Sequence, residues 1–132
     1  MIYKISVRTH QRTEFIEISH QIQQVVTESG IKNGVAYIWV PHTTAGITIN
    51  EHADPDVARD ILKELNKVIP FEDNYAHLEG NSAAHIKSSL VGCQTNVLVE
   101  DGRLALGTWQ GIFFCEFDGP RHRNVWVKIL AE

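Results

Sequence analysis

Residues 95–130, TNVLVEDGRLALGTWQGIFFCEFDGPRHRNVWVKIL, decide the fold of this chain. β-Branched and aromatic residues crowd the runs TNVLVE, RLALGTW, GIFFCEF and NVWVKIL, a composition typical of β-strands. Asp-Gly pairs at 101–102 and 118–119 lie between these runs, and this pair favours the tight turn of a β-hairpin. Because a hairpin joins antiparallel neighbours, the C-terminal third of the chain predicts strands joined mostly by hairpins.

Further strands are predicted toward the N-terminus. Apolar and polar residues alternate with the period of a strand in IYKISVRT (2–9) and TEFIEIS (13–19). The run VAYIWV (35–40) is apolar on both faces, which predicts a central strand covered on both sides. Pro41 ends that run, and GITINE (46–51) resumes as another strand.

Three helices are predicted from capping residues, glycines and prolines at their ends. The third of these helices is predicted to bury Ile86 and Leu90. The predicted limits are a Ser19 cap and Gly30 for the first helix, an Asp54 cap and Pro70 for the second, and an Asn81 or Ser82 cap and Gly92 for the third.

The order of these elements, ββαββααββββ, predicts an α+β fold in a single domain that spans residues 1–132. About eight strands imply a large mixed, mostly antiparallel sheet, with about three helices packed on one face. Such a sheet has exposed edges, which proteins often pair or cover. Association with copies of the same chain would cover them.

Composition excludes several classes of protein. The 132 residues carry 12 basic and 16 acidic side chains, a formal net charge of −4, so no electrostatic footprint for a nucleic acid is present. No run approaches the roughly 18 apolar residues that a membrane span needs, and the N-terminus does not resemble a secretory signal. Two cysteines are too few for a disulfide framework. A cytoplasmic location is therefore expected.

Three histidines are candidate metal ligands. His42 follows a strand-ending proline, His77 precedes a glycine turn, and His85 lies just inside the third predicted helix. A helix N-terminus disfavours imidazolium, and neutral imidazole is the form that binds a metal. If the three converge, they would form an open zinc-type site. The alternative is that they are partly buried histidines with backbone partners, and the spacing matches no recognised metal motif that would decide the question.

Polar residues at other strand ends are further candidates. Asn50 and Glu51 end the GITINE strand, and catalytic groups often collect near loops. Glu51 is predicted to act as a general base or to orient a ligand histidine, and Asn50 to contact a substrate. Thr108 and Gln110 flank Trp109 in a segment that could hold a flat ring, or that could be an ordinary strand with a core tryptophan.

Two arginines in DGPRHRN (118–124) are candidate phosphate ligands. Arg121 and Arg123 could grip phosphate oxygens through forked, bidentate hydrogen bonds. The alternative is a hairpin tip whose charges only keep the chain soluble. As exposed turn charges they would add little to stability.

With these stretches in view, the chain closely resembles the YjbQ family of secondary thiamine-phosphate synthase-like proteins. The resemblance extends over nearly the whole chain. It is carried by PHTTAGITINEHADPDV (41–57), HLEGNSAAHIKSSLVG (77–92), LGTWQGIFFCEFDGPRHR (106–123) and VWVKIL (125–130).

The resemblance implies an α+β fold, a homotrimer and a pocket lined by the histidines. It also implies a transferase that joins a pyrimidine-methyl diphosphate to a thiazole phosphate and releases pyrophosphate. In that reaction His77, His85 and Glu51 would be catalytic, and Asn50, Thr108, Gln110, Arg121 and Arg123 would bind a phosphate-bearing small molecule. Imidazole ligands at His42, His77 and His85 favour zinc over magnesium.

Two other functions remain open from the sequence. One is a metal-dependent hydrolase, in which Glu51 acts on a metal-bound water. The other is a trimer that binds a metabolite without catalysis.

Overall fold

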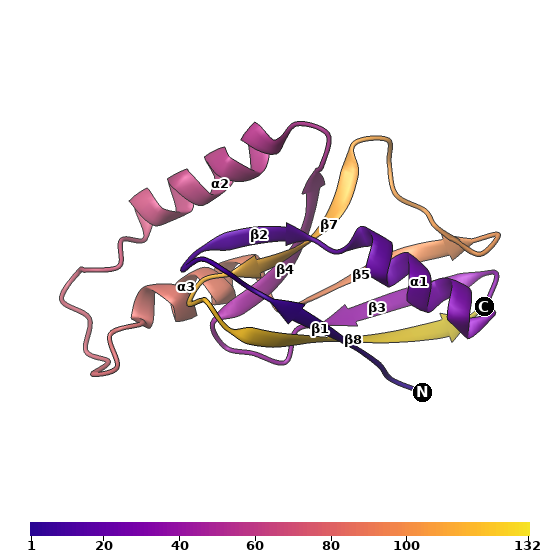
Figure 1. Cartoon of the computed structure of the whole chain (residues 1–132), viewed down its shortest axis with the longest axis horizontal. Helices are drawn as coiled ribbons and strands as arrows, with labels where there is room; N and C mark the ends of the chain where they lie inside the picture. Colours follow the sequence, from indigo (N-terminus) through magenta and orange to yellow (C-terminus); the bar gives the residue numbers. More distant parts are fainter.

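Two antiparallel sheets and three helices make up the fold, which a computed structural model describes over residues 1–132 (Figure 1). The larger sheet has the strand order β1-β8-β3-β5-β6, and the smaller sheet has the order β2-β7-β4. All of their strand pairings are antiparallel. The strands are β1 (Tyr3–Arg8), β2 (Glu14–Glu17), β3 (Gly34–Trp39), β4 (Ala45–Glu51), β5 (Gln94–Glu100), β6 (Arg103–Leu104), β7 (Gln110–Glu116) and β8 (His122–Ala131). The helices are α1 (Ser19–Ser29), α2 (Pro55–Val68) and α3 (Ser82–Val91).

The predicted α+β class with three helices and antiparallel strands is confirmed, but the strands form two sheets and few of them are joined by hairpins. The Asp101-Gly102 pair does join the paired strands β5 and β6, with both residues at positive φ as a tight hairpin turn requires. The second Asp-Gly pair instead connects β7 in the smaller sheet to β8 in the larger one. The chain passes from one sheet to the other at this turn, and the two sheets bury their apolar faces against each other.

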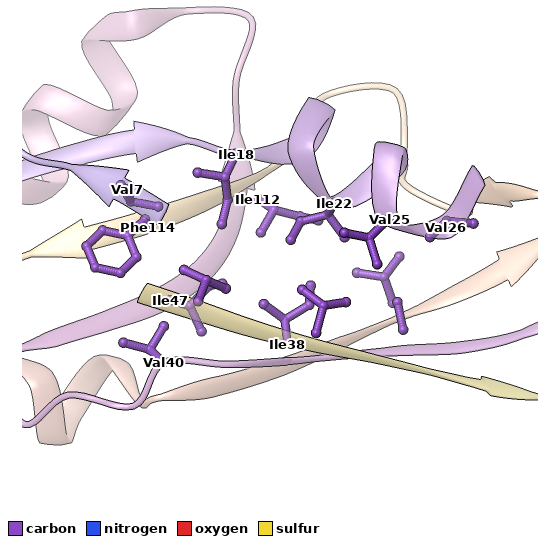
Figure 2. Packing of buried hydrophobic residues seen from close by; sticks show 14 of the residues in the cluster. Val7, Ile18, Ile22, Val25, Val26, Ile38, Val40, Ile47, Ile112 and Phe114 are labelled. Atoms are coloured by element: carbon purple, nitrogen blue, oxygen red, sulfur yellow. The ribbon is translucent and has the colours of Figure 1, made fainter. Parts of the chain in front are cut away.

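The main core lies between the two sheets and is closed at one end by α1 (Figure 2). Ile22, Val25 and Val26 of α1 point into it, as their helical spacing predicts. The strands contribute one residue in two, in keeping with the alternation of side chains along a strand. Buried strand residues of this core are Val7, Ala36, Ile38, Ala45, Ile47, Val97, Val99, Ile112, Phe114, Val125, Val127 and Ile129.

Helices α2 and α3 cover the other face of the smaller sheet. There Ala84 of α3 packs against Phe113, Cys115 and Phe117, with partly buried leucines of α2 beside them. Strand β7 is thus covered on both faces, and all but its first residue are buried. The side chain of Asp54 accepts a hydrogen bond from the Asp56 N–H at 2.9 Å, which confirms the predicted cap of α2.

The predicted buried face of α3 is wrong. Ile86 is 39% exposed and Leu90 is 69% exposed, whereas Ala83, Ala84, Lys87 and Ser88 are buried. Ser88 lies directly against β4, where its Oγ donates to the Ala45 backbone oxygen at 2.8 Å, and α3 ends on this strand. A Cβ on Gly46 would lie 2.6 Å from the backbone oxygen of Gly92, so the two backbones are already in contact.

Strand β3 is central in its sheet, but the prediction that both its faces are covered is wrong. Ala36 and Ile38 face the core, while Tyr37 and Trp39 on the opposite face are 43% and 46% exposed. No element packs on that face in the single chain, because the three helices lie on the other side of the larger sheet (Figure 1). No helix is both long enough and apolar enough to cross a bilayer.

Candidate functional site

A polar cavity of about 370 Å³ lies where three chain segments meet. These segments are the loop from β3 to β4, the start of α3 and the turn from β7 to β8. Apart from a proline, all of its lining residues are polar, so it suits a small polar ligand. The lining residues are Pro41, His42, Thr43, Thr44, Glu79, Asn81, His85, Arg121 and Arg123.

Arg123 does not lie on an exposed turn as predicted; it is a buried residue of β8, only 5% exposed. Its Nε donates to Glu116 Oε1 at 2.8 Å, and its Nη2 donates to Glu116 Oε2 and to Thr44 Oγ1. Its Nη1 makes no hydrogen bond within the chain. The guanidinium is therefore anchored on one side, and its free nitrogen is available to a ligand in the cavity.

The carboxylate of Glu116 is fully buried opposite Arg123. Burial alone would raise the pKa of Glu116, but the hydrogen bonds from Arg123, the Asp118 N–H and Thr9 outweigh it and hold that pKa below its usual range. Glu116 is therefore ionised at neutral pH, and the buried pair has no net charge.

Arg121 is anchored in a similar way at the rim of the cavity. Its Nε donates to the backbone oxygen of Asp118 at 2.8 Å, and its Nη2 donates to Asp118 Oδ2 at 3.0 Å. The same carboxylate oxygen accepts from Asn81 Nδ2 at 2.9 Å. Asn81 thus connects the start of α3 to the turn between β7 and β8 that carries Asp118 and Arg121. Its side chain makes no capping bond, although it occupies the predicted cap position of the helix.

His42 has a fixed tautomer. Its Nε2 accepts a hydrogen bond from the backbone N–H of Asn124 at 2.9 Å, so the proton of the neutral ring is on Nδ1. Burial lowers the pKa of His42, and the charge of Arg123 lowers it further. At neutral pH the ring is uncharged, and Nδ1 is a hydrogen-bond donor.

The predicted three-histidine metal site is wrong. No group of three or more His, Cys, Asp or Glu side chains is arranged to hold a metal ion. The Nε2 lone pair of His42 is already used by a backbone donor. His77 and His85 do lie close together, with ring centroids 5.7 Å apart in an edge-to-face arrangement, but His77 does not line the cavity with His42 and His85.

The structure separates the predicted site residues into two groups. Thr44 directly precedes the seven-residue strand β4 and Glu51 ends it, so the two lie roughly 20 Å apart at the usual rise per residue. Glu51 and Asn50 are therefore far from His42 and the arginines. Thr108 and Gln110 lie with Glu51, because β4 pairs with the start of β7.

The polar side chains at the Glu51 end of β4 accept hydrogen bonds from backbone N–H groups one to three residues away. Asn50 Oδ1 accepts from the Glu51 N–H at 2.7 Å, and Glu51 Oε2 accepts from the Asp54 N–H at 3.3 Å. Gln110 Oε1 accepts from the Gly107 N–H at 2.8 Å. Trp109 is 63% exposed, so it is not the core residue of an ordinary strand.

The sequence patterns did not indicate Thr43, Thr44, Glu79 or Asn81 as residues of the polar cavity, or Glu116 as the partner of Arg123. They indicated Asn81 only as a helix cap. An acidic residue within an apolar strand, GIFFCEF, is the one sequence signal that could have found Glu116.

Comparison with known proteins places the chain among relatives without an assigned activity. The family model described as UPF0047 protein YjbQ-like matches residues 3–132. A UPF0047 protein of Methanocaldococcus jannaschii is 54% identical, with 100% of this chain and 96% of the relative covered. UPF0047 protein YugU of Bacillus subtilis is 52% identical, with 99% and 100% covered.

Two solved structures share the fold. An uncharacterised conserved protein of the YjbQ/UPF0047 family from Clostridium acetobutylicum has a TM-score of 0.96 at 55% identity, covering 97% of this chain and 99% of that one. A YbjQ-like protein of unknown function from Sulfolobus solfataricus has a TM-score of 0.95 at 37% identity, covering 100% and 97%.

These findings correct three expected descriptions: transferase, thiamine biosynthesis and metal-binding protein. The relatives are named only as UPF0047 proteins, a structural neighbour is described as of unknown function, and no metal-binding group is present. The joining of two thiamine precursors stays an untested prediction. The sequence match and the shared fold nevertheless agree over nearly the whole chain, and the chain belongs to the YjbQ family.

Proposed function

We propose that the chain binds a small phosphate-bearing molecule in the polar cavity. The observation that carries this proposal is the pair of anchored arginines. Arg121 is held by Asp118 and Arg123 by Glu116, and both line the cavity with Nη1 free of any hydrogen bond in the chain. Guanidinium groups fixed in this way lose little freedom when they donate to phosphate oxygens.

The histidines of the cavity support the same ligand. His42 is held as a neutral ring with a donor Nδ1–H, and His85 is half-buried on the facing helix. Imidazole donors add hydrogen bonds to an anion without adding to the buried charge. The carboxylates of Glu116 and Asp118 already balance the two arginines, so the ligand must gain its affinity from directed hydrogen bonds more than from net charge.

Replacing Arg121 by Gln is expected to weaken the binding of inorganic phosphate and of simple phosphate monoesters by about tenfold, the effect of losing one charge-assisted hydrogen bond. Isothermal titration calorimetry measures this directly. Arg8→Gln is the matched control, because Arg8 is an exposed strand residue that does not line the cavity. If the parent binds no phosphate, or if both variants bind it equally well, the proposal fails.

We infer further that the chain forms a homotrimer through the open face of the larger sheet. This face carries large apolar side chains from three strands, and no element of the single chain covers them. An exposed apolar patch of this kind is typical of a protein-protein interface. Its main members are Tyr37, Trp39, Leu98, Trp126 and Leu130.

Replacing Trp39 by Asp is expected to dissociate the trimer, because it puts a charge on the apolar face beside Trp126. Sedimentation equilibrium at micromolar concentration should give three times the chain mass of 14.9 kDa for the parent and a single chain mass for the variant. Val68→Asp, at an exposed apolar position on α2, is the control and should stay trimeric. A monomeric parent would exclude the trimer.

The two cysteines are unpaired, which supports a proposed cytoplasmic location.

A further inference from the structure

A second cavity lies at the opposite end of β4 from the polar cavity. Its volume is about 510 Å³, and it shares no lining residue with the first. Phe15, Leu62 and Phe113 give it an apolar wall, which the polar cavity lacks. His52 and Glu17 lie in the same cavity, and each exposes 36% of its side chain. A small molecule could therefore contact both the apolar wall and the imidazole.

Glu17 holds the imidazole of His52 in one orientation. The distance from His52 Nδ1 to Glu17 Oε2 is 2.9 Å. Glu17 is itself fixed, because Ser19 Oγ donates to the same oxygen at 2.8 Å. Ser19 Oγ in turn accepts from the Ile112 N–H at 2.8 Å. The chain of bonds thus joins the imidazole to the backbone of β7 at the centre of the smaller sheet.

The glycine at 111 makes this arrangement possible. A Cβ at Gly111 would lie 2.6 Å from the Cβ of His52 and 2.7 Å from Glu17 Oε2. Any other residue at this position would push apart the histidine and the carboxylate.

The carboxylate fixes which nitrogen of His52 carries the proton. An ionised carboxylate can only accept, so Nδ1 must donate, and the lone pair of the neutral ring lies on Nε2. Nε2 makes no hydrogen bond within the chain. His42 has the same tautomer, but its Nε2 is occupied by a backbone N–H. Of these two imidazoles only that of His52 has a free acceptor nitrogen, and a carboxylate holds its ring in one orientation.

We propose that His52 is the general base of a second, hydrolytic site, and that Glu17 is its positioning residue. His52 Nε2 takes a proton from a water molecule while the water oxygen attacks the carbonyl carbon of an ester. The carbon–oxygen bond to the alcohol then breaks, and the leaving alcohol takes the proton back from Nε2. The sum of these steps adds one water to one ester and gives an acid and an alcohol. This site does not depend on phosphate binding in the polar cavity.

The charges around His52 select the substrate class. Glu14 and Glu17 come from β2 and Glu51 from β4, whereas Arg59 of α2 is the one arginine of the cavity and is paired with Asp56. An excess of carboxylates repels an anionic substrate. The apolar wall of Phe15, Leu62 and Phe113 favours an aryl or alkyl group. The substrate is thus a neutral or cationic ester with an apolar group, and the acid product is repelled after hydrolysis.

The test is the hydrolysis of 4-nitrophenyl acetate by the full chain. We expect kcat/KM to fall at least tenfold in His52→Gln. Glu17→Gln should lower kcat with little change in KM, because its amide can turn an NH₂ group toward Nδ1 and no longer fixes the tautomer, while the apolar wall is unchanged. The anionic ester 4-nitrophenyl hydrogen succinate should react more slowly than the acetate.

Surface histidines can also hydrolyse activated esters, so the control must be another histidine. His20 is exposed on α1 and lines neither cavity, and His20→Gln should keep the parent rate. The proposal is overturned if His52→Gln retains the parent rate or loses no more than His20→Gln. It is also overturned if Glu17→Gln, folded by circular dichroism, keeps the parent kcat.

Discussion

Replacing Glu116 by Gln is expected to lower the free energy of unfolding by about 3–5 kcal/mol, the usual effect of removing one partner from a buried ion pair. The variant leaves the guanidinium of Arg123 buried without a counter-charge. In either orientation the new amide also turns its NH₂ group toward one nitrogen of Arg123 and toward one other donor, Thr9 Oγ or the Asp118 N–H. Urea unfolding at pH 7, followed by circular dichroism, measures the change.

The effect should depend on pH in a defined direction. The pKa of Glu116 is lower in the folded chain than in the unfolded chain. Its stabilising effect is therefore fully present above the unfolded value of 4.5 and is lost as the pH falls through the folded value. The stability difference between parent and variant should shrink accordingly below pH 4.5.

An exposed ion pair provides the matched control. Arg59 and Asp56 are 2.8 Å apart on α2, with 72% and 66% of their side chains exposed. Asp56→Asn makes the same chemical change as Glu116→Gln, and it should alter the stability by less than about 1 kcal/mol. If Glu116→Gln costs no more than Asp56→Asn, the buried pair does not stabilise the fold.

Glu116 and Arg123 also show where sequence reasoning stopped. Helix limits depend on local signals, so the Asp54 cap of α2 and the Gly30 end of α1 could be predicted from a few neighbouring residues. The burial of Arg123 depends partly on Thr44, which lies 79 residues away in the sequence, just before β4. An arginine between a turn and a strand looks exposed when only its neighbours in sequence are considered.

The division of the candidate site has a similar cause. The polar cavity brings His42 and Arg121 together with His85, but Glu51, predicted to act at the histidine site, lies elsewhere. The strand that ends at Glu51 begins three residues after His42, and an extended strand places its two ends furthest apart. Predicting two cavities would have required knowing that both ends of β4 form sites with different neighbours.

Lys87 is the other large departure from expectation. The helical pattern of α3 placed Ile86 and Leu90 inside, yet Lys87 is fully buried and Ile86 is not. Its Nζ donates to Asn66 Oδ1 at 2.6 Å and lies 3.8 Å from the centre of the Phe71 ring. It forms no ion pair with a carboxylate. Burial, together with the smaller effect of the nearby charge of Arg12, lowers the pKa of Lys87 to about 8.

Replacing Lys87 by Met is therefore expected to stabilise the chain at pH 7 by about 2 kcal/mol. A shift in pKa from 10.5 to about 8 corresponds to a cost of about 3 kcal/mol for the buried ammonium, and the lost contacts with Phe71 and Asn66 offset part of the gain. Methionine fills a similar volume without a charge. Urea unfolding of parent and variant at pH 7 measures the difference, and Lys63→Met, at an exposed position on α2, should change the stability little.

The pH dependence distinguishes a buried charge from a simple packing effect. Between about pH 8 and pH 10.5 the folded chain has released the proton of Lys87 while the unfolded chain still binds it. The stability of the parent relative to Lys87→Met should therefore rise through this range, and the advantage of the variant should disappear above it. Taking the difference between the two proteins cancels other groups that titrate there, such as Cys115, whose pKa is raised by burial. A stability difference that stays constant from pH 7 to pH 11 would show that burying the Lys87 ammonium does not destabilise the folded chain.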